Sequence, residues 1–342
     1  MIPTHQNVHN RFKLNGFSMD KDDLCRVAYV FIKEGEPFEQ PVGDFILDWF
    51  SNNPYLEMKT SGTTGEPKII KISKKAMINS ALATGDYFGL KPGDKALHCL
   101  PVEYVAGKMM LIRGFILGLE LDFVAPNSNP LHRNTKKYDF AAMVPMQAQH
   151  SLNHLHQIKK IIIGGAKVNQ PLINDLMPIK SEIYETYGMT ETITHIAAKR
   201  IGEKSFQILP NVMISTDDRS CLVLHAPKIS DEVITTNDIV EIVDSEHFNW
   251  IGRYDNVINS GGIKLFPEQI EEKLISKINQ RFYITAKDDE ELGQKIVVVV
   301  EGEPFEINED IFSALGKYEK PKEIIFKPEF KTTATGKIIR EF

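Results

Sequence analysis

The sequence is poor in cysteine and in long apolar runs, and each absence excludes a class of protein. Its three cysteines, Cys25, Cys99 and Cys221, are isolated and show no metal-ligand spacing. We therefore expect free thiols, with neither a disulfide framework nor a structural zinc site. The longest apolar runs, such as residues 296–300, are far too short to span a bilayer, and the polar N-terminal residues 1–16 lack the apolar core of a signal peptide. These absences indicate a cytoplasmic protein without membrane insertion.

An excess of basic charge is also lacking. The 46 acidic and 40 basic residues give a net charge of −6 and are spread along the chain, so no basic stripe indicates nucleic acid or membrane lipid as a partner. An anionic ligand would need positive groups placed locally. The 342 residues, 42% of them hydrophobic, suffice for a real core and suggest two domains. The sequence has no internal repeat, and it leaves open whether the protein is a monomer or a homodimer.

Short apolar segments alternate with helical patterns over the first 250 residues. The segments expected to be buried strands end in glycine or proline and cover residues 95–101, 119–125, 159–166, 181–188 and 221–227. Between them, residues 73–89 predict a helix with Ser73 as its N-cap, and residues 108–119 predict an apolar helix. Strands that alternate with helices indicate an α/β body.

The pattern changes after about residue 255. The sequence there predicts an amphipathic helix over 267–278, a charged turn and strand over 288–303, a second helix over 309–318 and another strand over 322–330. This is the size of a small α+β lid. The boundary falls in a charged, glycine-containing loop at 252–255, which gives an N-terminal domain of residues 1–254 and a C-terminal domain of residues 255–342.

The stretch MKTSGTTGEPKIIKIS (58–73) is suited to hold a phosphate. Its glycines allow close approach of the backbone, its hydroxyls donate hydrogen bonds, and Lys68 adds a compact positive charge. A Walker-type loop is excluded, because Lys68 follows Pro67 and precedes Ile69 instead of following the second glycine. An ordinary turn between two strands uses the same residue types and is the alternative.

Five motifs in order give this sequence a resemblance to the adenylate-forming acyl- and aryl-CoA ligases, the family that includes luciferases and peptide-synthetase adenylation domains. They are TSGTTGEPK (60–68), YETYGMTET (184–192), TTND (235–238), GRYDNVINSGGIKLFPEQIE (252–271) and TATGKIIR (333–340). The resemblance implies a large N-terminal α/β domain and a small, mobile C-terminal α+β domain. It also implies a reaction in two halves, in which a carboxylic acid is converted with ATP and Mg²⁺ to an acyl-adenylate and then transferred to coenzyme A.

The resemblance assigns roles to residues around the nucleotide. The phosphate loop would cradle the β- and γ-phosphates through its backbone N–H groups, its hydroxyls and a lysine; it comprises Thr60, Ser61, Gly62, Thr63, Thr64, Gly65 and Lys68. In the central motif, Tyr187 would stack on adenine beside Gly188, Thr190 would contact the α-phosphate, and Glu191 would hold Mg²⁺. Gly164, Gly165 and Ala166 would pass beneath the nucleotide, where larger side chains would clash.

The remaining motifs supply the ribose site, the hinge and the catalytic lysine. Asp238 would bind the ribose hydroxyls together with Arg253, although the family usually has Thr-Gly-Asp where this chain has Thr-Asn-Asp. Asp255 takes the hinge position, and the family often has a second acid where Asn256 stands. Lys337, selected over Lys331 by the TGK frame, would stabilise charge on the carboxylate and α-phosphate as the adenylate forms.

The phosphate loop begins near residue 60, which is early for this family, so we expect a reduced N-terminal region. The compact build, with LPVEYVAGKMMLIRG (100–114), resembles the short o-succinylbenzoate-CoA ligases of menaquinone synthesis. That substrate is an aromatic dianion, and a second buried carboxylate needs a partner. Lys108 and Arg113 are the candidates, with snorkelling to solvent as the alternative; His98 is a third candidate that could simply end a strand, and Lys264 could contact coenzyme A or solvent.

Three other functions stay open at this level. The chain could be an aryl- or acyl-CoA ligase for benzoate-like or fatty acids, a catalytically inactive nucleotide-binding homologue, or a kinase. The retained Lys68, Glu191, Asp238, Arg253 and Lys337 argue against an inactive binder, because binding alone does not need the C-terminal lysine. A kinase would release ADP, whereas a ligase of this family would release AMP.

Overall fold

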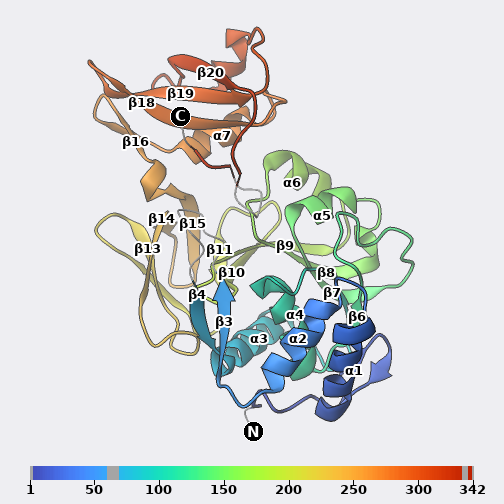
Figure 1. The fold of residues 1–342 in the computed structure, drawn as a ribbon. Coiled ribbons are helices and arrows are strands. Elements are labelled where there is room, and N and C mark those ends of the chain that lie inside the picture. The colour runs from blue at the N-terminus through green and yellow to red at the C-terminus, as the bar shows by residue number, and fades with distance from the viewer. Residues whose placement is uncertain (1–2, 60–68, 333–337, 341–342) are drawn as a thin grey trace.

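A computed structural model describes residues 3–59, 69–332 and 338–340 (Figure 1). Within these residues the largest sheet has 13 strands, and its middle is a run of five parallel strands in the order β9-β8-β7-β5-β6. These strands are β5 (Lys95–His98), β6 (Glu120–Phe123), β7 (Tyr138–Met143), β8 (Ile158–Ile163) and β9 (Glu182–Gly188). All five strands are covered on both faces, as is usual for parallel sheets. Four of them, β5, β6, β8 and β9, lie where the sequence predicts strands, whereas β7 was not predicted. The fifth predicted strand, over 221–227, is found as β13 (Cys221–His225) in the antiparallel part of the sheet.

Two layers of helices cover the two faces of these parallel strands. Because side chains alternate along a strand, Ala96 and Phe140 enter one core while Leu97 and Ala141 enter the other. The first core is closed by α1 (Lys21–Glu34), α2 (Gln40–Phe50), α3 (Lys74–Phe88) and α4 (Val105–Leu117). The second is closed by α5 (Pro145–His150), the 3₁₀ helix η1 (Leu155–Gln157) and α6 (Gln170–Leu176). Figure 1 shows the two groups of helices on either side of the sheet.

The start of α3 confirms the predicted cap and adds a buried lysine. The Ser73 side chain accepts a hydrogen bond from the Ala76 backbone N–H, as expected of an N-cap. The next residue, Lys74, is only 1% exposed. Its Nζ donates to the backbone oxygens of Asp48 at 2.6 Å and Ser51 at 3.0 Å and to Ser51 Oγ at 3.1 Å. Lys74 therefore satisfies carbonyls at the C-terminal end of α2 and fastens that helix to α3.

Short or antiparallel strands complete the sheet at its two edges. One edge carries β1 (Lys13–Leu14) and β2 (Phe17–Ser18). The other carries β10 (His195–Arg200), β11 (Phe206–Ile208), β12 (Met213–Thr216), β13 (Cys221–His225), β14 (Ile234–Ile242) and β15 (His247–Arg253). A separate antiparallel pair, β3 (Tyr55–Lys59) and β4 (Ile69–Ser73), brings together the two ends of the segment that contains the predicted phosphate loop.

The residues after 257 form a second sheet with its own core. It contains β16 (Ile258–Ser260), β17 (Ile263–Leu265), β18 (Phe282–Asp289), β19 (Gly293–Glu301) and β20 (Glu323–Lys327), and it packs against α7 (Pro267–Leu274). The short 3₁₀ helix η2 (Tyr254–Asn256) joins it to β15. The chain is thus an α/β protein with a large and a small part, as predicted, while the division into two domains at residue 255 stays a prediction.

The structure corrects the bounds of three predicted helices. The expected helix over 309–318 is wrong in type, because the chain forms only a 3₁₀ helix, η3 (Glu309–Ala314). The chain then turns at Gly316, whose N–H donates to Glu319, and Glu319 in turn pairs with Lys273 of α7. The helix predicted over 108–119 starts earlier, at residue 105, and the helix predicted over 267–278 ends at residue 274. Tertiary contacts, which no local pattern contains, set these ends.

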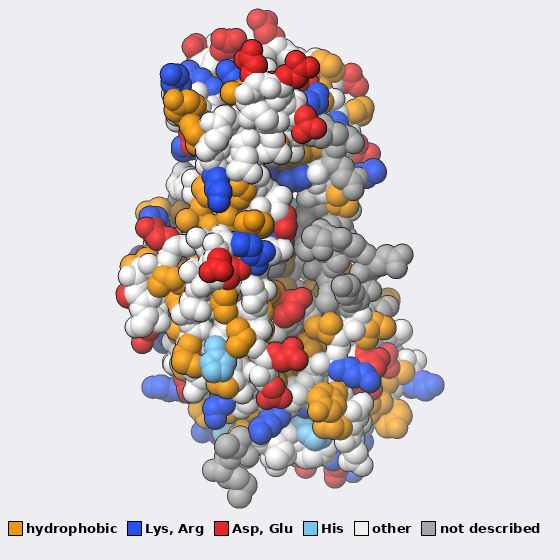
Figure 2. All heavy atoms as spheres, turned by 90° about the vertical axis from the view of Figure 1, so that its left-hand side faces the viewer, with side chains coloured by type: hydrophobic (Ala, Val, Ile, Leu, Met, Phe, Trp, Pro, Cys, Tyr) orange, Lys and Arg blue, Asp and Glu red, His pale blue; other side chains and the backbone are white. Residues whose placement is uncertain are grey.

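No helix among the described residues is long and apolar enough to cross a bilayer. On the face shown in Figure 2, acidic and basic side chains are intermixed, and lysines and arginines form no continuous stripe. This distribution agrees with the even charge pattern of the sequence.

Candidate active site

Several of the predicted site residues lie at the carboxyl ends of the parallel strands. His98 ends β5, Gly164–Ala166 follow β8, and Gly188 ends β9, directly before Thr190 and Glu191. Strand β5 has β6 on one side and β7 on the other, so the strand order reverses between β5 and β7. In open α/β sheets, ligands bind at the carboxyl ends of the strands where the order reverses. The topology therefore collects motifs that are far apart in the sequence along one edge.

Two groups of predicted residues lie outside the described part of the chain. The first is the phosphate loop, Thr60–Lys68, and the second is the segment that ends with Lys337. The residues on both sides of each group are described: Lys59 pairs with Ile69 between β3 and β4, and Thr332 forms a β-bridge with Ile338. Their assigned roles stay predictions.

The loop after β8 requires glycine at two successive positions. A Cβ on Gly164 would lie 2.6 Å from Thr186 Oγ1 on β9, and that hydroxyl donates to the Ile163 carbonyl at 3.1 Å. Gly165 has φ of +86°, in the left-handed region that favours glycine. The weak GGA signal in the sequence thus marks a place where the backbone packs closely and turns tightly beside the end of β9.

A hydrogen-bonded group surrounds Asp238 on β14. The Tyr187 hydroxyl donates to Asp238 Oδ2 at 2.7 Å, and Trp250 Nε1 donates to Oδ1 at 3.1 Å. Arg253, opposite Asp238 in the β14–β15 register, places Nη1 3.8 Å from the same Oδ1. Burial, then the neighbouring Asp238 carboxylate, raises the pKa of Tyr187, so its hydroxyl stays a neutral donor. The structure thus brings together Tyr187, Asp238 and Arg253, which the sequence analysis named, and adds Trp250.

Trp250 was missed because no motif includes it. It lies three residues before Arg253 on β15, and only the pairing of β14 with β15 brings it to Asp238. Its ring also has Lys167 Nζ above it, 5.4 Å from the centroid, and Lys167 makes an ion pair of 2.9 Å with Glu272 on α7. Trp250 therefore lies where the large sheet meets the C-terminal part.

The loop that carries Thr190 and Glu191 has a strained backbone that local hydrogen bonds hold in place. Ile193 has φ of +68°, which is unusual for a β-branched residue, and its side chain is buried. The Thr192 hydroxyl lies 2.7 Å from the Thr194 carbonyl and 2.9 Å from the Met189 N–H. These contacts fix the turn and leave Glu191 exposed at its tip. Backbone strain of this kind costs on the order of 1–3 kcal/mol and is characteristic of functional loops.

The predicted hinge residue is tied to the strand that carries Asp238. Asp255 accepts hydrogen bonds from Arg253 Nη2 at 2.9 Å and from Asn237 Nδ2 at 3.2 Å. The Asn237 Oδ1 accepts in turn from Arg219 Nη1 at 3.1 Å. Asn237 stands where the family usually has glycine, so this departure supplies a side chain that links β14 to the hinge.

Two of the three residues predicted to bind the acid, His98 and Lys108, give less evidence of such a role than the third, Arg113. His98 is fully buried against the Phe123 ring, and burial lowers its pKa to about 4. Neither of its ring nitrogens has a hydrogen-bond partner among the described residues. Lys108 is partly buried, and its Nζ donates to the Glu103 carbonyl at 3.1 Å. His98 does end a strand, as the alternative interpretation had it, and Lys108 reaches a backbone carbonyl near the start of its own helix.

Arg113 is a buried cation without a counter-ion among the described residues. It is 1% exposed, so the alternative of snorkelling to solvent is wrong. Its Nη1 contacts Met110 Sδ and its Nη2 contacts Thr194 Oγ1, both at 3.5 Å, while Nε has no partner. Burial lowers the pKa of the guanidinium to about 9. A buried charge is stable only when it is paired, so this side chain lacks an anion.

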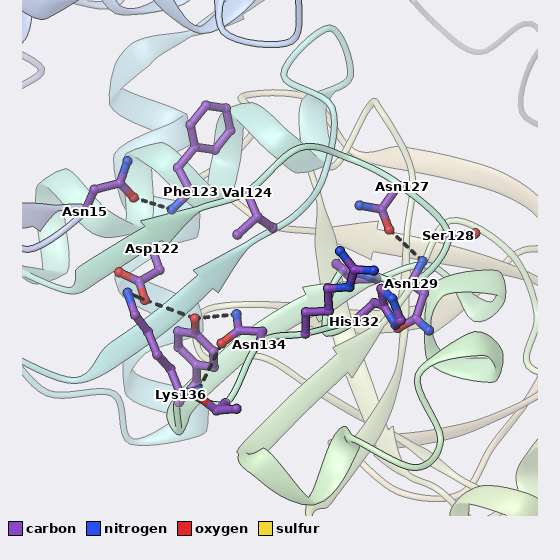
Figure 3. A pocket seen from close by; sticks show the side chains of 14 residues that line it. Asn15, Asp122, Phe123, Val124, Asn127, Ser128, Asn129, His132, Asn134 and Lys136 are labelled. Atoms are coloured by element: carbon purple, nitrogen blue, oxygen red, sulfur yellow. Dashed lines mark hydrogen bonds and ion pairs between the residues drawn. The ribbon is translucent and has the colours of Figure 1, made fainter. Parts of the chain in front are cut away.

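A cavity of about 620 Å³ lies elsewhere, beside the segment between β6 and β7 (Figure 3). Two of its charged groups already pair with each other, because Asp122 accepts from Lys136 at 2.7 Å and also from the Tyr138 hydroxyl at 3.0 Å. None of the described residues predicted for the site lines it. The described residues also contain no group of three or more His, Cys, Asp or Glu side chains that could hold a metal ion.

Comparison with known proteins gives consistent matches. The family model described as AMP-binding enzyme matches residues 35–220. The chain is 27% identical over 313 residues to the 2-succinylbenzoate–CoA ligase of Lactococcus lactis, covering 83% of this chain and 69% of that protein. It is 28% identical over 271 residues to the Haemophilus influenzae protein of the same name, covering 72% of this chain and 59% of that protein.

Solved structures match as well. An acyl-CoA synthetase (AMP-forming)/AMP-acid ligase II-like protein from Dyadobacter fermentans is 35% identical, with a TM-score of 0.63 and coverage of 92% of this chain and 96% of that one. The o-succinylbenzoate coenzyme A synthetase of Bacillus subtilis, in complex with ATP and magnesium, is 20% identical, with a TM-score of 0.74 and coverage of 83% and 68%. The second likeness establishes the fold alone.

Proposed function

We propose, from the premise that this chain belongs to the AMP-binding enzyme family, that it is an AMP-forming ligase that joins o-succinylbenzoate to coenzyme A. In the first half of the reaction a carboxylate oxygen of the acid attacks the α-phosphorus of ATP, and pyrophosphate leaves. In the second half the thiol sulfur of coenzyme A attacks the acyl carbon, loses its proton, and AMP leaves. The relatives named 2-succinylbenzoate–CoA ligase support this acid.

The observation that carries the choice of acid is the unpaired guanidinium of Arg113. In a simple monocarboxylate the only carboxylate reacts with ATP, so the acid has no second anionic group that could pair with Arg113. An acid with two carboxylates can place one at the phosphate and the other on Arg113, where a planar fork matches a carboxylate. We propose Arg113 as the partner of this second carboxylate, and His98 and Lys108 as secondary candidates along the acid.

The nucleotide would lie over the ends of β8, β9 and β14. We propose that Asp238 accepts hydrogen bonds from the two ribose hydroxyls, since its oxygens keep free lone pairs beside the bonds from Tyr187 and Trp250. Arg253 would assist it, and Tyr187 would stack on the adenine. The backbone of Gly164–Ala166 and Gly188 would pass close to the nucleotide, and Thr60–Lys68 would hold its β- and γ-phosphates.

Charge at the α-phosphate would be handled by three groups. Thr190 would donate its hydroxyl there, and Lys337, from the C-terminal part, would stabilise the developing charge. Mg²⁺, which neutralises phosphate charge, would enter with ATP. Glu191 suits it, because Mg²⁺ is commonly held by one or two carboxylates plus substrate phosphates rather than by a protein cage. Asp255 would be the hinge of a C-terminal domain that starts there and rotates between the two half-reactions.

A panel of matched acids tests this proposal. Purified protein with ATP, Mg²⁺ and coenzyme A is offered o-succinylbenzoate and two analogues that each lack one carboxylate, 4-oxo-4-phenylbutanoate and 2-butanoylbenzoate. We expect pyrophosphate release, and a thioester of the correct mass, to be most efficient with the diacid. The analogue that still reacts identifies the activated carboxylate. If benzoate or fatty acids outcompete the diacid, the choice of substrate is wrong, and if ADP appears instead of AMP, the reaction class is wrong.

A further inference from the structure

A line of hydrogen bonds runs from α3 through the start of β10 to Arg113. We propose that His195 and Thr84, two buried residues that do not touch the acid, are positioning residues that hold the Arg113 guanidinium ready for the second carboxylate. This inference rests on the proposed function, and it adds the residues that orient Arg113, the cation proposed to select the diacid. No sequence motif pointed to either residue for this role.

The line contains four contacts. Thr84 Oγ1 lies 2.9 Å from the Ser80 carbonyl one turn earlier in α3 and 3.4 Å from His195 Nε2. His195 Nδ1 lies 3.3 Å from Thr194 Oγ1, which lies 3.5 Å from Arg113 Nη2. Thr84 and His195 are both buried, and the His195 ring also packs against Phe88 at a centroid distance of 5.9 Å.

The direction of every bond in this line follows from its two ends. A carbonyl only accepts, so the single hydrogen of the Thr84 hydroxyl goes to Ser80, and Thr84 Oγ1 must accept from His195 Nε2–H. A neutral imidazole has one N–H, so His195 Nδ1 accepts from the Thr194 hydroxyl. The Thr194 oxygen then offers only lone pairs to Arg113, which only donates. The position of the hydrogen on each group is therefore fixed by the hydrogen bond that the preceding group makes.

The neutral state of His195 is essential to this direction. A protonated ring would donate from both nitrogens, reverse the Thr194 hydroxyl towards Arg113, and put a second cation beside an already unpaired one. Burial, together with the charge of Arg113, lowers the pKa of His195 well below its ordinary value, so the ring stays neutral at physiological pH. Thr194 therefore presents an acceptor to the guanidinium throughout the working range.

The same line leaves the rest of the guanidinium available. Arginine has five N–H donors; Thr194 and Met110 each take one, and Nε–H has no partner in the part of the chain that the structure describes. Fixing one side of the planar fork sets the orientation of its other donors. A carboxylate that arrives then meets preorganised donors, and little freedom of the arginine is lost on binding.

Two substitutions at residue 195 separate positioning from packing. His195→Gln keeps one donor and one acceptor, whereas His195→Phe keeps the ring and its contact with Phe88 but removes both nitrogens. We expect kcat/KM for o-succinylbenzoate to fall about tenfold or more in His195→Phe, mainly through KM for the acid, and to stay within about threefold of wild type in His195→Gln. If His195 only fills space, kcat/KM should instead fall more in His195→Gln than in His195→Phe, because phenylalanine keeps the packing of the ring.

Thr84→Val and Ser80→Ala provide a second, matched pair on α3. Thr84→Val is nearly isosteric and removes the acceptor for His195, so we expect about a three- to tenfold loss. Ser80→Ala removes a buried hydroxyl that has no partner within residues 3–59, 69–332 and 338–340 and leaves the backbone carbonyl in place, so we expect kcat/KM within about twofold of wild type. KM for ATP should not change in any variant, and a thermal melt checks that each one is folded.

The outcomes distinguish failure of this inference from failure of the proposed function. If wild type forms the thioester of the diacid but His195→Phe performs as well as His195→Gln, the positioning role is refuted. Equal activity of Thr84→Val and Ser80→Ala refutes it independently, even if the histidine variants do not fold. A wild-type protein that converts no diacid refutes the proposed function instead.

Discussion

Two buried cations, Arg113 and Lys74, should respond to the same substitution with opposite signs. Each is 1% exposed, and each would be replaced by methionine, an unbranched apolar side chain. Lys74 has three oxygen acceptors within 3.1 Å. Arg113 has a thioether, one distant hydroxyl and an unpartnered Nε. We expect Arg113→Met to stabilise the free protein and Lys74→Met to destabilise it.

The structure sets the magnitudes for stability. A guanidinium pKa lowered to about 9 corresponds to a cost of the charged form on the order of 5 kcal/mol. Replacing poorly compensated buried charges with apolar groups typically recovers about 1–4 kcal/mol, which we expect for Arg113→Met. For a chain of this length that is a rise in Tm of about 2–6 °C. Lys74→Met removes the three hydrogen bonds that a buried ammonium makes between α2 and α3 and should cost about 2–4 kcal/mol.

The same substitution should remove selection for the diacid. Truncating one partner of a buried, hydrogen-bonded charge pair costs about 2–5 kcal/mol, so kcat/KM for o-succinylbenzoate should fall by about 30-fold to 5000-fold in Arg113→Met. Arg113→Lys keeps the charge but not the planar fork and should lie between. Lys74→Met should leave kcat/KM within about threefold, because its hydrogen-bond partners Asp48 and Ser51 are not among the predicted site residues.

Thermal and urea unfolding, with and without the diacid, measure the stability of all three variants. Added diacid at 100 times Kd should raise the unfolding free energy of wild type by about 2.7 kcal/mol, and its Tm accordingly, and should raise neither in Arg113→Met. Thioester formation with the acid panel gives the activities. The reasoning is refuted if Arg113→Met destabilises the free protein as much as Lys74→Met does, because the guanidinium would then already be paired.

Three further predictions concern other parts of the site. Burial lowers the pKa of His98 to about 4, so its contribution to stability is present above about pH 6.5 and is lost as the pH falls towards 4. Between pH 7.5 and 5, wild type should therefore lose about 2 kcal/mol more unfolding free energy than His98→Leu. Urea titrations of the two proteins measure this difference, and equal pH profiles would contradict it. Asp238→Asn should raise KM for ATP at least tenfold with little change in KM for the acid, because it weakens the acceptor for two hydroxyls; steady-state kinetics with each substrate varied would expose a general loss instead. Lys337→Ala should suppress ATP–pyrophosphate exchange by about a hundredfold or more while leaving thioester formation from supplied acyl-adenylate comparatively intact, with Lys331→Ala as the control; an equal loss in both halves would remove the assigned role.

Much of the candidate site could be predicted from the sequence, because its motifs are local. Gly164 and Gly165 are needed for close approach and a positive φ at those two positions, and the pattern of apolar strands placed them at the end of β8. Asp238 and Arg253 were expected together, and the register pairs them directly. Trp250 and His195 were not predicted, because each meets its hydrogen-bond partner only through the pairing or packing of segments that are distant in the sequence.

Local residue patterns alone determined the α/β class, four of the five parallel strands, the Ser73 cap and the order of the motifs, since periodicity and turn chemistry act over a few residues. Only the tertiary structure decided that Arg113 is enclosed with no counter-ion from any described residue while Lys74, equally buried, has three oxygen acceptors. Each is one basic residue in a predicted helix, and nothing in its sequence neighbours distinguishes their roles. The difference between a structural lysine and an arginine that needs an anion lies in which oxygens the packed chain brings within reach, and desolvation makes that difference worth several kcal/mol.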